Sequence, residues 1–396
     1  MAADCRALIA ERIRARGPIT VAEYMELALH HPECGYYARA SCRTGRAGDF
    51  FTSVDVGSLF GELLAVQIAE MWRLLDRDEE PGARDEGLVA GGRDFDLVEA
   101  GAGNGRLARD ILEWLQQRDP ACHAAVRLHL VERSPEARRD QPRALGPHAG
   151  KVASSSDGLP VRIDGVLYAN ELLDALPTHL VEMTSEGLRE VFVDLDDDRL
   201  VERAGPPSSP DLARSLARSG AALEAGWRAE VNLNAEAWVK DAARRLARGF
   251  LLLIDYGHRA ADLYSAGRAA GTLTAYTRHT AAGPGSDPAR TPDWLVDPGS
   301  RDITAHVDLT SLARAAEGEG LAAIAALDQT YFLLGLGLAE RLAESSGDAP
   351  GDIQRRLALK TLMMPGGLGS THKVLIFGRG VGSPRLRGCS FGVRLT

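Results

Sequence analysis

The chain is most informative at Asp96-Leu97-Val98-Glu99-Ala100-Gly101-Ala102-Gly103-Asn104-Gly105. Its apolar beginning predicts a buried strand that ends in the carboxylate of Glu99, and a helical pattern follows from Arg106 to Gln117. Glycines are needed where the backbone turns sharply and a ligand approaches it closely. The stretch therefore predicts a strand, a ligand-binding loop and a helix, which is the repeating unit of an α/β fold.

Two classes of ligand use such a loop. The dinucleotide fingerprint GxGxxG requires a third glycine at position 106, where this chain has Arg106, and the chain has no GxxxxGK[ST] phosphate-binding pattern. The spacing ExGxGxG instead suits S-adenosylmethionine, whose sulfonium and amino group are cationic and would be attracted to Glu99. We therefore expect Glu99, Gly101, Gly103 and Gly105 to bind this cofactor, although a tight strand-to-helix turn would also use these glycines.

Two further acidic residues fit the same cofactor. Glu132 ends the next predicted strand, in HLVERSP, where a carboxylate can accept hydrogen bonds from both ribose hydroxyls. Asp157 follows a third strand, in SSSDGLP, and is a candidate for contact with the adenine amine. For Asp157 an ordinary turn residue is the competing interpretation.

The segment YANELLDALP, residues 168–177, follows the fourth predicted strand and opens on the carboxyl edge of the sheet. Glu171 and Asp174 are three positions apart, so a helical turn would place both carboxylates on one face. Such a pair can hold an arginine guanidinium and accept its proton during methyl transfer. The alternative is that Glu171 closes the strand and Asp174 caps a short helix.

The rest of the chain predicts one α/β domain with additions. Residues 1–75 are predicted to be a helical layer, with Thr20 as a helix cap, and residues 76–93 form a polar, glycine-rich linker. Residues 94–396 form the core, in which short apolar runs alternate with helical patterns, as in a parallel sheet. Insertions are expected at about 179–248, beginning with a hairpin, and at about 259–305, which is rich in Gly, Pro, Thr and Ser.

The composition of the chain limits which binding partners and which cellular compartment are expected. The chain has 396 residues, and its 46 basic against 55 acidic residues give a net charge of -9, which argues against a nucleic-acid partner. The five cysteines contain no CxxC pair and predict reduced thiols in an intracellular protein. We find no secretory or membrane-spanning pattern, and so expect a cytoplasmic protein without a membrane partner.

No metal is expected. The residues that could suggest one, His30, His31, Cys34 and Cys42, do not have the spacing of a common zinc site. The other histidines singled out, His279, His306 and His372, are isolated in the sequence and are interpreted as structural.

These motifs together resemble the MidA-like S-adenosylmethionine-dependent methyltransferases, a family that includes a mitochondrial protein arginine methyltransferase. The resemblance covers nearly the whole chain. The blocks that carry it occur in family order: HPECGYY, GRAGDFFTS, LFGELLA, EAGAGNGRLARDIL, LVERSP, ANELLDALP, IDYG, GTLTAYTRH, DITAHVDLT and GSTHKVL. Two segments depart from the family pattern: Val54-Asp55 replaces a usual proline-glutamate, and GSTH lacks a usual acidic residue.

The resemblance implies a class I methyltransferase fold, with a Rossmann-like seven-stranded sheet, an N-terminal helical layer and insertions. It also implies that Asp49, Phe50 and Thr52 help to close the cofactor site. Ala102 and Asn170, inside and beside the motifs above, complete the expected cofactor residues. The expected acceptor is a protein that presents arginine. The alternatives are a small-molecule O- or N-methyltransferase and a non-catalytic assembly factor that retains the fold.

Overall fold

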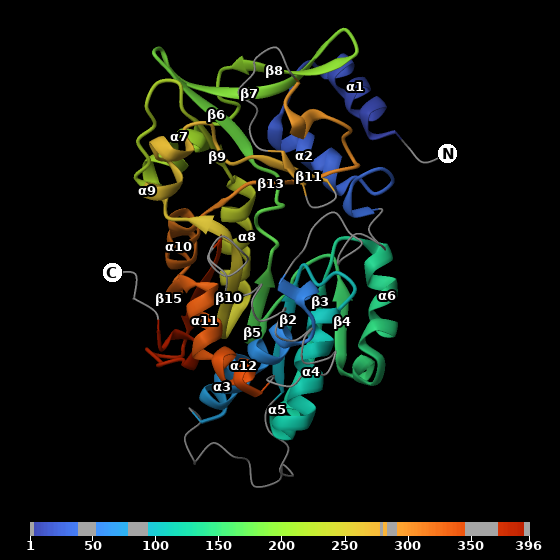
Figure 1. Cartoon of the computed structure of the whole chain (residues 1–396), viewed down its shortest axis with the longest axis vertical. Helices are drawn as coiled ribbons and strands as arrows, with labels where there is room; N and C mark the ends of the chain where they lie inside the picture. Colours follow the sequence, from blue (N-terminus) through green and yellow to red (C-terminus); the bar gives the residue numbers. More distant parts are fainter. Residues whose placement is uncertain are drawn as a thin grey trace. The chain divides into compact units, whose positions relative to one another are not determined.

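The structure is a computed structural model that describes residues 4–38, 53–77, 94–277, 280–282, 291–344 and 371–391 (Figure 1). The chain divides into two compact units, which are considered separately. The insert unit comprises Met1–Phe51, Leu172–Val239 and Tyr256–Ala315. The Rossmann unit comprises Thr52–Glu171, Lys240–Asp255 and Ala316–Thr396. This division falls inside the segment 1–75 that the sequence groups as one helical layer.

The Rossmann unit is built on a sheet whose main path has the order β15-β16-β10-β5-β2-β3-β4. These strands are β2 (Phe95–Ala100), β3 (Val126–Val131), β4 (Val152–Ser156), β5 (Ile163–Asn170), β10 (Leu246–His258), β15 (Ala322–Asp328) and β16 (His372–Arg379). The pairs from β10 to β4 are parallel, whereas β15 and β16 are antiparallel. A parallel sheet closed by an antiparallel edge pair in this order is the class I methyltransferase fold, so the predicted fold class is confirmed.

Helices flank this sheet and complete its core (Figure 1). They are η2 (Ser53–Val56), α3 (Leu59–Arg77), α4 (Arg106–Arg118), α5 (Pro120–Ala125), α6 (Pro135–Leu145), η3 (Gly146–Lys151), α11 (Gln329–Gly335), α12 (Leu338–Glu344) and η6 (Arg387–Cys389). All six residues of β2 are buried, as expected for a parallel strand covered on both faces. Phe60 and Ile68 of α3 and Ile111 of α4 lie in the same apolar cluster as Leu97 of β2. This packing holds β2 and the loop after it in place.

The insert unit contains two antiparallel sheets. The larger has the order β1-β7-β6-β9, with β8 added beside β7, and the smaller has the order β12-β11-β13. The elements are α1 (Cys5–Arg16), β1 (Ile19–Thr20), α2 (Val21–His30), β6 (His179–Thr184), β7 (Gly187–Asp196), β8 (Arg199–Gly205), α7 (Pro210–Ser219), β9 (Arg228–Val231), α9 (Ala260–Leu263), η4 (Ala266–Arg268), β11 (Thr274–Thr277), β12 (Thr280–Ala282), η5 (Asp293–Leu295), β13 (Asp302–Thr304) and β14 (Val307–Asp308). α8 (Leu233–Arg245), α10 (Leu309–Gly318) and β10 contain residues of both units.

The insert unit contains three features for which the sequence made a prediction. Thr20 caps α2 as predicted, because its hydroxyl accepts a hydrogen bond from the Glu23 amide at 3.1 Å. The predicted hairpin near residues 179–202 is confirmed as the antiparallel pair β6 and β7, and β8 extends it into a meander. The segment expected to be irregular after residue 259 contains the small sheet, whose β11 and β13 pair Tyr276 with Asp302.

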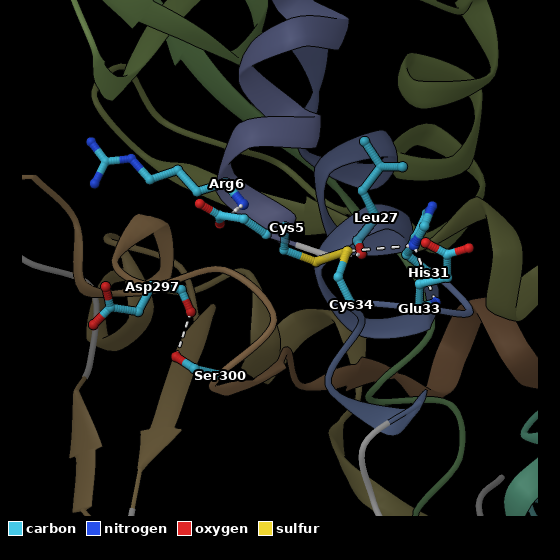
Figure 2. Close-up of a disulfide and its surroundings, with 9 residues drawn as sticks. Cys5, Arg6, Leu27, His31, Glu33, Cys34, Asp297 and Ser300 are labelled. Carbon is cyan, nitrogen blue, oxygen red and sulfur yellow. Dashed lines mark hydrogen bonds between the residues drawn. A yellow bond between two sulfur atoms is a disulfide. The ribbon is translucent and has the colours of Figure 1, made fainter. Parts of the chain in front are cut away.

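Cys5, the first residue of α1, forms a disulfide with Cys34 in the turn after α2 (Figure 2). The prediction that the cysteines are reduced thiols is therefore wrong for this pair. The packing of α1 and α2 brings their Cα atoms to 5.2 Å although they are 29 positions apart in sequence. A cysteine count cannot detect such a pair, and it no longer indicates a compartment for this protein. Cys122 and Cys389 are free, and Cys42 lies outside the described residues.

Breaking this disulfide is expected to destabilise the protein. The chain-entropy account of a cross-link that closes a loop of this length gives about 3.6 kcal/mol of stabilisation. Cys34→Ser should therefore unfold at a lower urea concentration than the wild type, and reductant should then have no further effect. Cys389→Ser, which changes a free cysteine, should keep the wild-type sensitivity to reductant. Equal unfolding midpoints for oxidised and reduced wild type would contradict this expectation.

Candidate functional site

The glycine-rich loop lies between β2 and α4, as the sequence predicts. Gly101, Gly103 and Gly105 have φ values of 73°, 50° and 83°, in the left-handed region that other residues rarely adopt. The three alternate glycines are therefore required by the backbone itself. They turn the chain from the end of β2 into the first turn of α4 at Arg106.

The amides of this loop are engaged by the protein. Gly101 and Ala102 both donate to the Val131 carbonyl at the end of β3, at 2.9 and 3.1 Å. Gly103 donates to Glu132 Oε2 at 2.8 Å, and Gly105 donates to the Ala102 carbonyl at 2.8 Å. A phosphate-binding loop instead directs its amides at the ligand. The loop is thus shaped by β3 and Glu132, and it is not arranged as a phosphate cradle.

Glu132 has a structural part in this arrangement that sequence reasoning missed. Its Oε1 accepts a hydrogen bond from the Ser134 amide at 2.8 Å, and its Oε2 accepts the one from Gly103. Each carboxylate oxygen has a second lone pair, so Glu132 can fix the loop and still accept a ligand hydroxyl. Asp157 follows β4 directly and is exposed.

Glu99 is a buried carboxyl group with only 4% of its surface exposed. Burial raises its pKa to about 8, and the charges of Glu132 and Asp110 act in the same direction. The Tyr168 side chain and the backbone of Ala108 lower this pKa, but by less. Glu99 is therefore mostly protonated at pH 7 in the free protein, and a cationic ligand would favour its ionised form.

Glu171 lies directly after β5 and has an unusual backbone. Its φ of 50° is in the left-handed region, which costs a non-glycine residue roughly 1–2 kcal/mol. Its amide donates to the Ile254 carbonyl of β10 at 2.8 Å, and its side chain is 5% exposed. Glu171 Oε1 accepts hydrogen bonds from the Ser53 amide at 3.0 Å and from Asn170 Nδ2 at 3.2 Å. The structure thus holds one oxygen of this carboxylate firmly.

Glu99 Oε2, Asn170 Oδ1 and Glu171 Oε2 are among the buried side-chain atoms that have no hydrogen-bond partner in the part of the chain that the structure describes. They belong to the carboxyl ends of β2 and β5, which are adjacent and in register, since Ala100 pairs with Ala169. Buried acceptors without donors are rare in folded proteins because the loss of hydration is costly. This edge of the sheet is suited to a ligand that brings positive charge and hydrogen-bond donors.

Asp174 belongs to the insert unit, because the division falls between Glu171 and Leu172. The residue is 3% exposed, and its backbone carbonyl accepts a hydrogen bond from the Ala305 amide at 3.1 Å. Residues 172–177 form turns and no helix, so the idea that Asp174 caps a short helix is wrong. Burial raises the pKa of Tyr276, and the charges of Asp174 and Asp302 raise it further, so both acids lie near this ring.

The segment near residue 53 contains three residues predicted to close the cofactor site and one site residue that the sequence did not predict. Asp49, Phe50 and Thr52 lie outside the described residues. Ser53 was not predicted, yet its amide contacts Glu171, and its hydroxyl lies 3.2 Å from Gln329 Nε2. No local pattern in a single sequence could have revealed these contacts.

Two positions that differ from known sequence patterns, one in the glycine-rich loop and one in η2, are in contact in the structure. Arg106, which replaces the third glycine of the dinucleotide fingerprint, forms an ion pair of 2.6 Å with Asp55. Asp55 is part of the pair that replaces the usual proline-glutamate, and its side chain is fully buried. The positive charge of Arg106 is therefore paired with a carboxylate from η2.

The described residues contain neither a group of metal ligands nor a membrane-spanning helix. Across residues 4–38, 53–77, 94–277, 280–282, 291–344 and 371–391, no three His, Cys, Asp or Glu residues are grouped as ligands of a metal ion. In the same ranges, no helix is both long enough and apolar enough to cross a membrane.

Comparison with known proteins identifies the family. Residues 63–326 match a family described as "Putative S-adenosyl-L-methionine-dependent methyltransferase". This chain belongs to that family. The resemblance to MidA-like methyltransferases drawn from the motifs is confirmed, and the protein is an S-adenosyl-L-methionine-dependent methyltransferase.

Relatives and solved structures agree with this assignment. The protein arginine methyltransferase NDUFAF7, mitochondrial, of Mus musculus is 31% identical over 84% of this chain and 73% of its own length. Its Rattus norvegicus counterpart is 30% identical over 90% of this chain and 80% of its own. A crystal structure of a Burkholderia thailandensis protein bound to S-adenosyl-homocysteine has a TM-score of 0.85 and 30% identity, and covers 99% of this chain and 95% of that one.

The raised pKa of Glu99 predicts how cofactor binding by this MidA-like protein depends on pH. If the cationic cofactor binds the ionised carboxylate, the affinity should rise by about tenfold per pH unit below pH 8. Binding at pH 7 should release close to one proton, measured by calorimetry in buffers of different ionisation enthalpy. Glu99→Gln should bind the cofactor more weakly than the wild type at pH 8, and its affinity should no longer depend on pH in this way. This variant therefore separates the titration of Glu99 from any titration of the cofactor itself. A pH-independent wild-type affinity between pH 6 and 7.5 would contradict the role of Glu99.

Proposed function

We propose that this MidA-like methyltransferase transfers a methyl group to an arginine side chain of a protein. The observation that carries the proposal is Glu171, a buried carboxylate with one oxygen held by Ser53 and Asn170 and the other without a donor from the described residues. The names of the relatives, which are protein arginine methyltransferases, support the same acceptor.

We assign the cofactor to the edge formed by β2, β3 and β5. Glu99 and Asn170 offer buried acceptors there, and Glu132 offers its remaining lone pairs. The backbone of Gly101, Ala102, Gly103 and Gly105 would form the floor. Asp157 and the segment with Asp49, Phe50 and Thr52 remain candidates for the adenine end and the closure of the site. S-adenosyl-L-methionine supplies a methyl group activated by its sulfonium.

The acceptor determines what Glu171 and Asp174 must do. A guanidinium has a pKa above about 12, so its nitrogen must lose a proton as it attacks the methyl carbon. In that step a C–N bond forms, the S–C bond breaks, and we assign the released proton to Glu171 Oε2. Asp174, three positions after Glu171 in the sequence, stays the second carboxylate that we propose for the acceptor, since a carboxylate matches the planar geometry of a guanidinium.

The function is tested by incubating the protein with methyl-labelled S-adenosyl-L-methionine and a lysate from a strain that lacks its gene. Mass spectrometry should find the label as methyl-arginine in protein. Label only in small molecules would favour the small-molecule alternative. Cofactor binding in calorimetry without any labelled product would favour the non-catalytic alternative.

A further inference from the structure

Glu171 Oε1 is contacted from three separate parts of the Rossmann unit. Ser53 from η2 and Asn170 from β5 donate hydrogen bonds to it at 3.0 and 3.2 Å. His372, the first residue of β16, places its Nε2 at 3.5 Å from the same oxygen, which is an ion-pair distance, and this nitrogen makes no hydrogen bond to the described residues. The His372 side chain is fully buried, and Glu171 is 5% exposed. A histidine that the sequence presents as isolated therefore lies against the proposed proton acceptor.

The chemistry of these three groups differs. The Ser53 amide and the Asn170 side chain are neutral donors, whereas an imidazole can donate and can also carry positive charge. A carboxylate with so little exposure to water is stable only if it is hydrogen-bonded or paired with positive charge. Lys373, the next residue along β16, is already paired with Asp328. Among the described residues, His372 is thus a basic side chain within ion-pair distance of Glu171.

The backbone of Glu171 fixes only part of its side chain, so contacts such as that of His372 can orient the rest. Its left-handed φ sets the direction of the Cα–Cβ bond, but the carboxylate can still rotate about its terminal torsion. Contacts on Oε1 from different directions oppose that rotation and leave Oε2 as the oxygen that can accept a proton. On the far side of the imidazole, Thr371 Oγ1 lies 3.4 Å from His372 Nδ1 and limits rotation of the ring.

We propose that His372 is a positioning residue, which holds Glu171 Oε1 so that Oε2 accepts the proton of the methyl acceptor. This inference rests on the proposed function of Glu171. A histidine that only fills space would be replaced well by another side chain of similar size. A positioning histidine requires a donor at the place of Nε2, which the side-chain amide of glutamine supplies and leucine does not.

The experiment compares His372→Leu with His372→Gln, using methyl-labelled S-adenosyl-L-methionine and the lysate described above. His372→Leu should slow methyl transfer by about tenfold or more, with the calorimetric Kd of the cofactor changed by less than about twofold. His372→Gln should recover most of the rate. A folded His372→Leu protein with the wild-type rate, or a glutamine variant as slow as the leucine variant, would overturn the proposal.

A double variant tests whether His372 acts through Glu171. Glu171→Gln combined with His372→Leu should be no slower than Glu171→Gln alone, because the two residues then serve one step. Additive losses would overturn the proposal. If Glu171→Gln itself keeps the full rate, the proposed role of Glu171 fails, and with it the part assigned to His372.

The contact between His372 and Glu171 can also be tested by NMR spectroscopy, which needs no methyl acceptor. The ¹⁵N signals of the His372 ring, assigned by their loss in His372→Gln, should shift when Glu171 is changed to Gln in the cofactor-free protein. The signals of His258, in the insert unit, serve as the control and should stay in place. An unshifted His372 signal would overturn the contact even if methyl transfer to arginine is found. A shifted signal in a protein that transfers no methyl group would retain the contact and reject the proposed function.

Discussion

Glu171→Gln is expected to slow methyl transfer by about 10²- to 10³-fold, the range typical for removal of a general base. The amide keeps the size of the side chain and an oxygen that can accept from the Ser53 amide and Asn170 Nδ2. It cannot take up a proton at neutral pH, so attack by a guanidinium nitrogen loses its acceptor. Cofactor affinity, measured by calorimetric titration, should change by less than about threefold.

The control for this variant is Glu186→Gln, which changes an exposed glutamate of the insert unit and should leave the rate unchanged. Thermal unfolding should show that both variants are folded. A Glu171→Gln protein with the wild-type rate would remove Glu171 from the proton transfer. A large loss of cofactor affinity would instead assign Glu171 to the cofactor site.

Gly103→Val is expected to weaken cofactor binding by at least about 100-fold. The φ of Gly103 is 50°, and a β-branched residue in this region costs roughly 1–2 kcal/mol or forces the loop to rearrange. Rearrangement would break the hydrogen bond from the Gly103 amide to Glu132 Oε2. A Cβ at this position also meets no protein atom within 4 Å, so the new side chain would enter open space above the loop. Calorimetric titration with S-adenosyl-L-methionine measures the loss.

Gly146 offers a closely matched control. It follows α6 with a φ of 54°, and a Cβ there also meets nothing within 4 Å. Gly146→Val therefore introduces similar backbone strain outside the glycine-rich loop and should keep the wild-type affinity. Equal losses in the two variants would show that strain alone weakens binding. Undiminished binding by Gly103→Val would remove this loop from the cofactor site.

Much of the fold was predictable because the signals are local. An apolar run, three alternate glycines and a helical pattern are sufficient to specify β2, the loop and α4. The φ values of Gly101, Gly103 and Gly105 explain why no other residue suits those positions. The order of motifs along the chain also identified the family, since it needs no knowledge of contacts between distant residues.

The candidate site was predictable only in part. Glu99 and Glu132 could be proposed from the sequence because each lies at the end of a predicted strand, and parallel strands end at the same edge of their sheet. The protonated state of Glu99 was not predictable, because its pKa depends on burial by the whole core. The second role of Glu132, as acceptor for the loop amides, likewise appears only when β3 lies beside the loop.

The sequence alone determined the class of fold, the glycine-rich turn and the family of this protein, because short-range backbone preferences and motif order are properties of the linear chain. Only the tertiary structure showed that Cys5 meets Cys34, that Arg106 meets Asp55, and that His372 lies against Glu171. Residues 171 and 372 are joined by no local pattern. Their contact follows from the packing of β5, β10 and β16 into one sheet, where burial of apolar side chains sets which distant polar groups must share a site.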